Sequence, residues 1–337
     1  MSSREPLAAI FGCAGTELSD AERGFFRHAA PVGFILFKRN CVEPGQVARL
    51  VAALRDTADD ADAPILIDQE GGRVARLGPP HWPVYPAPAA IAALGGAAAR
   101  EAAVLGARLI ADDLGRLGIS VDCLPVLDIP LPGADPIIGD RAWGTEPTEV
   151  VRLGRAACQG LLAGGILPVV KHIPGHGRAM VDSHLALPRV EASRDILEAT
   201  DFAPFRELRD MPWAMTAHVV YAAIDLDMPA TLSRRVIGDA IRGTIGFDGV
   251  LLSDDLSMGA LGGGLGARAG AALEAGCDLV LHCNGRMDEM IDVARAARPA
   301  SAVTKRRLAA GEAKRRPPAA FDRGASEARF RELLGTM

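Results

Sequence analysis

Eight short apolar runs recur along the chain, and each is followed by a polar or glycine-containing loop. Runs this short and this apolar are typical of strands buried on both faces, which is the pattern of a parallel sheet. The runs cover residues 7–12, 32–37, 64–68, 119–126, 167–171, 213–218, 249–254 and 277–283. The chain is therefore expected to build its core from eight parallel strands.

Stretches with apolar residues at helical spacing separate these runs. They cover residues 43–60, 97–118, 147–165, 194–210, 233–246 and 266–276. Eight strands that alternate with helices over 337 residues predict a single-domain α/β fold, a (β/α)8 TIM-like barrel, with a doubly wound open sheet as the alternative. We expect residues 1–300 to form the barrel and residues 301–337 to add peripheral helices and a tail of the same domain.

Side chains that can do chemistry gather at the ends of these runs. They are Asp68, Asp128, Lys171 with His172, His218, Asp254 with Asp255, and Asn284. A barrel brings the carboxyl ends of all its strands to one rim around one pocket, whereas an open sheet spreads them along a line. The distribution of these residues therefore favours the barrel.

Composition and charge limit the partners of the chain. Hydrophobic residues make up 49% of it, and 37 Lys and Arg face 42 Asp and Glu, so the net charge is −5. This balance gives no general reason to expect a nucleic acid or an anionic membrane as a partner. The basic stretch from residue 301 also lacks the interleaved aromatic residues of a nucleic-acid binder.

The chain shows no sign of export. Its N-terminal residues lack the order of a secretory signal, and no window holds the uninterrupted apolar residues of a membrane span. The six cysteines are scattered without a CxxC pair, which favours free buried thiols over a disulfide framework or a zinc site. We therefore expect a cytoplasmic protein.

The seventh run ends in two adjacent acids, within LLSDDLSM (251–258). Ser and Asp are preferred at helix N-caps, so capping alone is one explanation for either acid. Two neighbouring acids also allow one to cap while the other faces the pocket. We assign the chemical role to Asp254 and the structural role to Asp255. A carboxylate that faces a sugar ring can attack the anomeric carbon, provided that an acid protonates the leaving oxygen.

The segment KHIPGHGRAMVDSHLALP (171–188) holds three of the seven histidines. Its proline and glycines exclude a regular helix, so we expect a loop. In an extended loop Asp182 and His184 project to the same side, where the carboxylate can fix the tautomer of the imidazole and make the pair a general acid and base. A surface loop without such a role is the alternative.

A metal site in this segment is the competing interpretation. His172, His176, His184 and Asp182 can supply ligands, but no recognised ligand spacing is present and Lys171 would repel a cation. We therefore expect no metal. His176 is expected to support the loop through hydrogen bonding, while the dyad lies further out on a mobile part of it.

Two further stretches offer polar groups for a ligand. In DQEGGRVARL (68–77), Asp68 can accept hydrogen bonds from two vicinal hydroxyls, although an N-cap followed by surface arginines explains the stretch equally well. In IIGDRAWG (137–144), Arg141 can hold a sugar oxygen or a carboxylate. The GxGxxA pattern within 259–270 does not directly follow a strand, so we expect no phosphate cradle there.

Seven stretches, in order, resemble those of a known family: DQEGGRVARL, LPVLDI, IGDRAWG, KHIPGHG with VDSH, MTAHVVY, GFDGVLLSDDLSMGA and LEAGCDLVLHCN. The chain resembles the bacterial β-N-acetylhexosaminidases of glycoside hydrolase family 3 that act in peptidoglycan recycling. The resemblance implies a retaining hydrolase without metal or other cofactor, active in the cytoplasm. The implied substrate is a small carbohydrate, N-acetylglucosamine linked to 1,6-anhydro-N-acetylmuramic acid, with or without peptide. We expect a monomer that binds neither nucleic acid nor membrane.

The resemblance also implies roles for single residues. Asp254 matches the family's nucleophile, His184 its general acid and base, and Asp182 the partner of that histidine. The positions that match binders of the terminal N-acetylglucosamine are Asp68, Arg76, Arg141, Lys171 and His172. Two alternatives remain open. One is a phosphorylase that uses the same pocket, because a neutral histidine does not repel phosphate as a carboxylate does. The other is a sugar-binding protein without catalysis.

Overall fold

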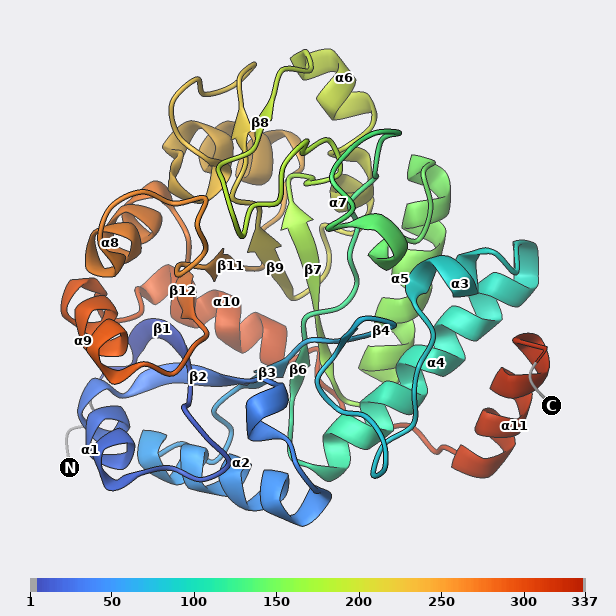
Figure 1. The fold of residues 1–337 in the computed structure, drawn as a ribbon, viewed down its shortest axis with the longest axis horizontal. Coiled ribbons are helices and arrows are strands. Elements are labelled where there is room, and N and C mark those ends of the chain that lie inside the picture. The colour runs from blue at the N-terminus through green and yellow to red at the C-terminus, as the bar shows by residue number, and fades with distance from the viewer. Residues whose placement is uncertain (1–4, 336–337) are drawn as a thin grey trace.

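The computed structural model describes residues 5–335, and its centre is a closed barrel of eight parallel strands (Figure 1). Around the barrel the strands follow the order β1-β12-β11-β9-β7-β6-β3-β2. They are β1 (Leu7–Gly12), β2 (Pro31–Leu36), β3 (Ile65–Ile67), β6 (Val121–Asp122), β7 (Leu167–Ile173), β9 (Trp213–Thr216), β11 (Val250–Asp255) and β12 (Leu279–His282). The predicted barrel is confirmed and the open sheet is wrong, because β1 pairs with both β2 and β12.

Each predicted run holds one barrel strand, but the fourth strand is much shorter than its run. β6 covers only two residues of 119–126. Pro125 has no N–H to donate to a ladder, and beyond it only an isolated bridge joins Val126 to Lys171. The chain nevertheless stays beside β7, because Lys171 N donates to Pro125 O and Leu127 N donates to Lys171 O, and it so brings Asp128 to the rim.

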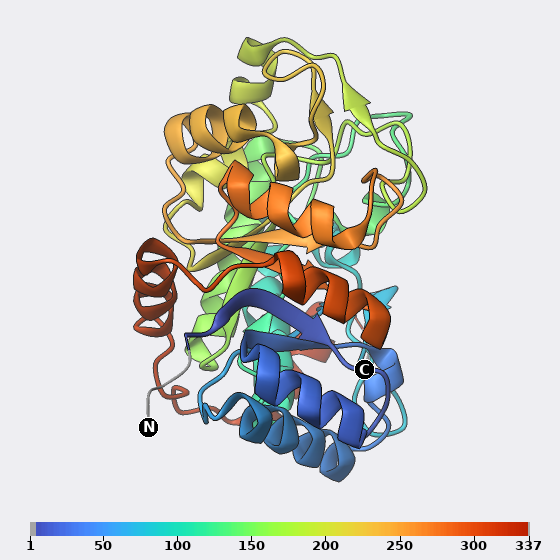
Figure 2. The same ribbon diagram turned by 90° about the vertical axis from the view of Figure 1, so that its left-hand side faces the viewer.

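Helices cover the outside of the barrel. They are α1 (Asp20–Ala29), α2 (Pro44–Ala58), α3 (Pro88–Ala92), α4 (Gly96–Arg116), α5 (Pro147–Ala163), α6 (Arg194–Ala199), α7 (Ala203–Glu207), η4 (Val236–Thr244), α8 (Leu265–Ala275), α9 (Met287–Ala296), α10 (Ala302–Glu312) and α11 (Arg323–Leu333). The helices after the first and last strands, blue and orange, lie side by side on one flank (Figures 1 and 2).

The helices differ from the predicted ones at five places, and two of these are α3 and α9, which were not predicted. The single helix expected over 194–210 is two short helices, since Pro204 lies in the first turn of α7 and cannot continue the hydrogen bonds of α6. The helix expected over 233–246 is the π-helix η4. α1 was not predicted, although Ser19 and Glu22 form a complete capping box at its start.

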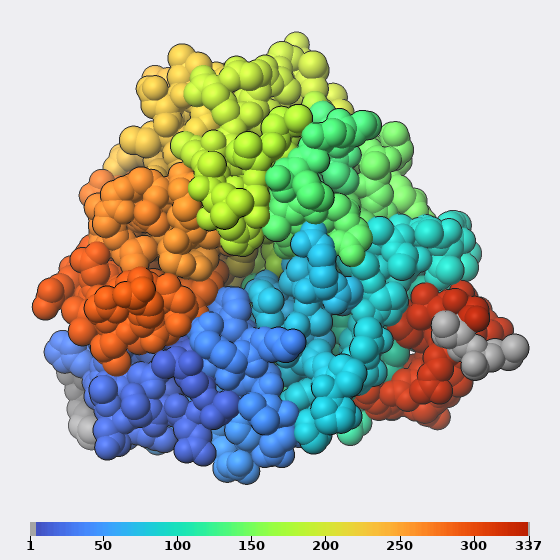
Figure 3. Space-filling view, viewed as in Figure 1, coloured from blue at the N-terminus to red at the C-terminus, as the bar shows by residue number. Residues whose placement is uncertain are grey.

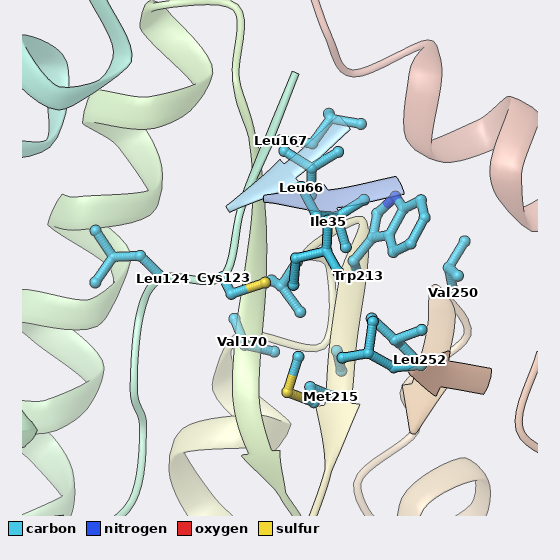
Figure 4. Packing of buried hydrophobic residues seen from close by; sticks show 14 of the residues in the cluster. Ile35, Leu66, Cys123, Leu124, Leu167, Val170, Trp213, Met215, Val250 and Leu252 are labelled. Atoms are coloured by element: carbon cyan, nitrogen blue, oxygen red, sulfur yellow. The ribbon is translucent and has the colours of Figure 1, made fainter. Parts of the chain in front are cut away.

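Buried side chains from opposite walls of the barrel fill its interior. Figure 4 shows Leu66, Leu167, Met215 and Leu252, which come from four different strands. At the outer edge, α11 lies against α4 (Figure 1), where the ring of Phe330 covers Gly106. Between residues 5 and 335, no helix is long and apolar enough to cross a membrane.

Candidate active site

The carboxyl ends of the barrel strands surround a cavity of about 280 Å³. Seven of the eight predicted site residues line it: Asp68, Arg76, Arg141, Lys171, His172, His184 and Asp254. The eighth, Asp182, contacts His184. The molecule is hollowed near the centre of this face, between yellow-green, orange and blue segments (Figure 3). The barrel thus brings together residues that lie up to 186 positions apart in the sequence.

A network of buried charges forms one wall of the cavity. The Lys171 ammonium lies 2.8 Å from Asp68 Oδ1 and 2.6 Å from Glu70 Oε1. Arg141 donates two hydrogen bonds to Glu70, from Nε at 2.9 Å and from Nη2 at 2.8 Å. Arg76 Nη2 donates to Asp68 Oδ2 at 2.8 Å. The three cations are therefore held in place by two carboxylates before any ligand arrives.

The cations also fix the charge state of these carboxylates. Burial would by itself raise the pKa of Asp68, but Lys171 and Arg76 outweigh it and hold that pKa well below its usual range. Burial likewise opposes ionisation of Glu70, yet Lys171 and Arg141 lower its pKa. Both groups are carboxylates at neutral pH. The cations already occupy some lone pairs of the carboxylate oxygens, and the remaining lone pairs can accept hydrogen bonds from sugar hydroxyls.

Glu70 was not predicted as a site residue. Its side chain is fully buried, and it joins Lys171 to Arg141 at the start of a hairpin made by β4 (Gln69–Gly71) and β5 (Val74–Ala75). The only local signal was its position two residues after Asp68. A buried glutamate needs a paired cation, and that partner lies 71 residues away.

Asp254 lies near the end of β11 and lines the cavity. Its Oδ1 accepts the Asp255 N–H at 2.8 Å, and its Oδ2 lies 4.0 Å from His172 Nε2. Burial would raise the pKa of Asp254, but His172 and then His218 more than compensate, so the pKa is lowered. Asp254 is therefore an ionised carboxylate with one oxygen held by the backbone.

Asp255 is engaged in the turn that follows. Its Oδ2 accepts the Ser257 hydroxyl at 2.6 Å, and its Oδ1 accepts the backbone N–H groups of Ser257 at 3.1 Å and Cys283 at 3.3 Å. It also lines the cavity. These three donors are consistent with the structural role expected for Asp255 beside Asp254.

Asp128 orients the histidine next to Asp254. Its Oδ2 lies 2.7 Å from His172 Nδ1, and its Oδ1 accepts the backbone N–H groups of His172 at 3.1 Å and His176 at 2.6 Å. The pKa of Asp128 is lowered because His172 and His176 outweigh the effect of burial. A carboxylate only accepts hydrogen bonds, so Nδ1 carries the proton when His172 is neutral, and Nε2 faces Asp254.

Asp182 and His184 form the expected pair, but through a turn and not through an extended loop. Leu185 N donates to Asp182 O at 3.0 Å, so the chain folds back at this point. Asp182 Oδ1 accepts the His184 N–H at 2.8 Å and lies 2.7 Å from His184 Nδ1. The pKa of Asp182 is lowered, because these contacts outweigh its desolvation. Nδ1 is thus occupied, and Nε2 is the nitrogen open to a ligand.

The loop that carries this pair is fastened to the loop after β11. Gly259 N donates to His184 O, and Ala260 N donates to Ser183 O, both at 3.1 Å. Inside the loop, His176 Nε2 lies 3.0 Å from Ser183 Oγ. Burial and His172 lower the pKa of His176 to about 4, so it is neutral and supports the loop as expected. These contacts hold His184 on the same rim as Asp254.

The histidines of this segment do not converge on a metal site. Within residues 5–335, no group of three His, Cys, Asp or Glu side chains is arranged to hold a metal ion. His172 is paired with Asp128 and His184 with Asp182, so the two rings belong to separate clusters. The ionised Asp254 and the His184 of the histidine–aspartate pair thus line a single cavity. Chemically, such a carboxylate can act as a nucleophile, and such a pair can act as a general acid and base.

Comparison with known proteins shows the family to which the chain belongs. Residues 13–312 match the family model of the glycosyl hydrolase family 3 N-terminal domain. The Beta-hexosaminidase of Alkalilimnicola ehrlichii is 42% identical over 284 residues, which cover 82% of this chain and 80% of the relative. That of Tolumonas auensis is 40% identical over 285 residues, which cover 81% of each chain. The solved structure of NagZ from Neisseria gonorrhoeae in complex with N-trifluoroacetyl-D-glucosamine is 32% identical, with a TM-score of 0.87 and with 100% of this chain and 99% of that chain covered. The chain therefore belongs to glycosyl hydrolase family 3 and is a glycoside hydrolase.

Proposed function

We propose that this glycoside hydrolase is a retaining exo-β-N-acetylglucosaminidase. The observation that carries the proposal is that ionised Asp254 and the His184–Asp182 pair border one cavity. In the first step an oxygen of Asp254 attacks the anomeric carbon, the bond to the leaving oxygen breaks, and His184 Nε2 gives its proton to that oxygen. In the second step His184 takes a proton from water while the water oxygen displaces Asp254 from the same carbon. Two inversions give net retention.

The buried charge network serves as the binding site for the terminal sugar. Asp68, Arg76, Arg141, Lys171 and His172 hold its hydroxyl and N-acetyl groups in this proposal. Because these side chains are already fixed by one another or by Glu70 and Asp128, little conformational entropy is lost when the sugar binds. A fixed sugar also keeps the anomeric carbon within reach of Asp254.

The substrate we propose is N-acetylglucosamine linked to 1,6-anhydro-N-acetylmuramic acid, with or without stem peptide. The reaction then belongs to cytoplasmic cell-wall recycling and is carried out by a monomer. Support for the N-acetylglucosamine half of the substrate comes from the relatives named Beta-hexosaminidase and from the NagZ structure that holds N-trifluoroacetyl-D-glucosamine. The alternative is phosphorolysis in the same pocket. A histidine as the acid would allow it, because a neutral histidine does not repel phosphate as a carboxylate does.

Product analysis with this disaccharide, with and without phosphate, tests the proposal. We expect free N-acetylglucosamine at a rate that does not depend on phosphate, and loss of at least 99% of the rate in Asp254→Ala. Formation of N-acetylglucosamine 1-phosphate would show a phosphorylase. Near-wild-type turnover by Asp254→Ala would remove the proposed nucleophile, and binding without turnover would show a sugar-binding protein.

A further inference from the structure

Exposed apolar side chains are concentrated in the chain segment that carries the His184–Asp182 pair. Among the described residues, eleven large hydrophobic side chains are exposed, and four of them fall within residues 180–187. These four are Met180 at 63%, Val181 at 42%, Leu185 at 80% and Leu187 at 40% exposure. We call this set the apolar rim. Isolated exposed apolar residues are ordinary, but a cluster of them marks a contact surface.

The local fold inverts the usual arrangement of a surface loop. Ser183, the small polar residue in the middle, is buried and lies 3.0 Å from His176 Nε2, while Leu185 two positions later is exposed. The loop is fastened at this point, since its backbone accepts hydrogen bonds from Gly259 and Ala260. The backbone that carries the apolar rim is therefore fixed by hydrogen bonds, and its side chains are exposed although the loop is ordered.

The rim offers no charge of its own besides the catalytic pair. Residues 180–187 contain no lysine or arginine. The flanking cations are engaged elsewhere, because Arg178 Nε donates to Asp201 at 2.6 Å and Arg189 Nε donates to Glu191 at 2.6 Å. A group that lies on the rim thus meets hydrocarbon surface, and it is selected by its apolar area and not by its charge.

We propose that the apolar rim is a leaving-group subsite that binds the aglycone through an apolar face, such as an alkyl chain, an aryl ring or the C–H face of a second pyranose. This rests on the proposed function, in which His184 protonates the leaving oxygen. The charged wall of the cavity takes the glycosyl half of the substrate. The other half begins at the oxygen next to His184, so it emerges beside the residues that flank His184 in the same loop.

Methyl and n-hexyl β-N-acetylglucosaminides test the subsite. Their alkoxide leaving groups have nearly equal acidity and differ in apolar area, so the ratio of their kcat/KM values reports contact with the rim. We expect the wild type to prefer the hexyl glycoside about tenfold, which corresponds to about 1.4 kcal/mol. In the Met180→Ser/Leu185→Ser double variant we expect the ratio to fall close to one. Both side chains are exposed, so the substitutions remove little packing from the folded protein.

Val303→Ser is the matched control, because Val303 is 42% exposed on α10, in a different element from the loop that carries the apolar rim. It should keep the wild-type ratio. A wild-type ratio near one overturns the subsite, and so does a high ratio that survives in the double variant. An unchanged ratio together with altered self-association or vesicle binding would assign the rim to a second copy or a membrane and also overturn the proposal. Failure to hydrolyse either glycoside, or an aryl β-N-acetylglucosaminide, would contradict the proposed function itself.

Discussion

Replacing Glu70 with glutamine should destabilise the fold by about 3 kcal/mol and disorder the sugar-binding wall. Glu70 is fully buried and neutralises Lys171 at 2.6 Å and Arg141 at 2.8 Å. Glutamine keeps the shape of the side chain but removes its charge. Its NH2 group would also face a nitrogen donor of Lys171 or Arg141, which needs an acceptor. Removing one partner of a buried ion pair typically costs about 3–5 kcal/mol. We take the lower end, because Asp68 still pairs with Lys171.

Calorimetry measures this change. An unfolding entropy of about 2.1 cal/mol/K per residue means that 3 kcal/mol lowers the Tm of a chain of this length by about 4 °C. Because the pKa of Glu70 is lowered in the folded state, its stabilisation is complete above the ordinary glutamate pKa of about 4.3 and is lost as the pH falls through the folded pKa. The Tm difference between the two proteins should therefore be constant from about pH 6 to 8 and shrink in acid.

An exposed ion pair supplies the control for this variant. Glu191 pairs with Arg189 at 2.6 Å, and both side chains are exposed, so Glu191→Gln should change stability by less than about 1 kcal/mol. If Glu70→Gln is no less stable than Glu191→Gln at pH 7, the buried network does not hold the wall together. A Tm loss without any loss of kcat/KM would also refute the reasoning, since it would separate stability from positioning.

Two further substitutions test how the catalytic groups are positioned. In Asp128→Asn, the amide NH2 group should donate to His172 Nδ1, so that the ring proton moves to Nε2 and faces Asp254. We expect kcat to fall about tenfold to a hundredfold. The changed tautomer should appear in ¹⁵N spectra of the His172 ring, and an unchanged tautomer would contradict the role of Asp128. Gly259→Ala would put a Cβ atom 2.7 Å from His184 O and displace His184. We expect slower turnover of glycosides with poor leaving groups, which need protonation, and little change with good ones. Equal slowing of both would show general damage to the site.

The barrel could be predicted because it depends on local sequence patterns, namely short apolar runs and the polar residues that follow them. Eight apolar runs, several of them ending in a polar residue, are enough to favour a barrel with one functional rim, and Asp68, Lys171 and Asp254 lie on that rim. The chain also signals α1 through its Ser19–Glu22 capping box. The runs of apolar residues do not show where regular strand pairing ends, so β6 was predicted too long.

Contacts between distant segments could not be predicted in this way. Glu70 meets Arg141 across 71 residues and Asp128 meets His172 across 44. Neither pairing leaves a periodic signal, because each depends on how the strand ends converge in the closed barrel. The Asp182–His184 pair was predicted correctly from spacing two apart, but the geometry behind it is a turn in which the aspartate also caps the backbone.

The identity of the nucleophile is the centre of the account, and peptide mass spectrometry after trapping tests it most directly. A 5-fluoro-N-acetylglucosaminyl fluoride reacts quickly in the first step and slowly in the second, so a covalent intermediate should accumulate. We predict one glycosyl adduct per chain, on the peptide that contains Asp254, and none in Asp254→Ala. An adduct on Asp68 or Asp255, or full turnover with inversion at the anomeric carbon and no adduct, would contradict the account.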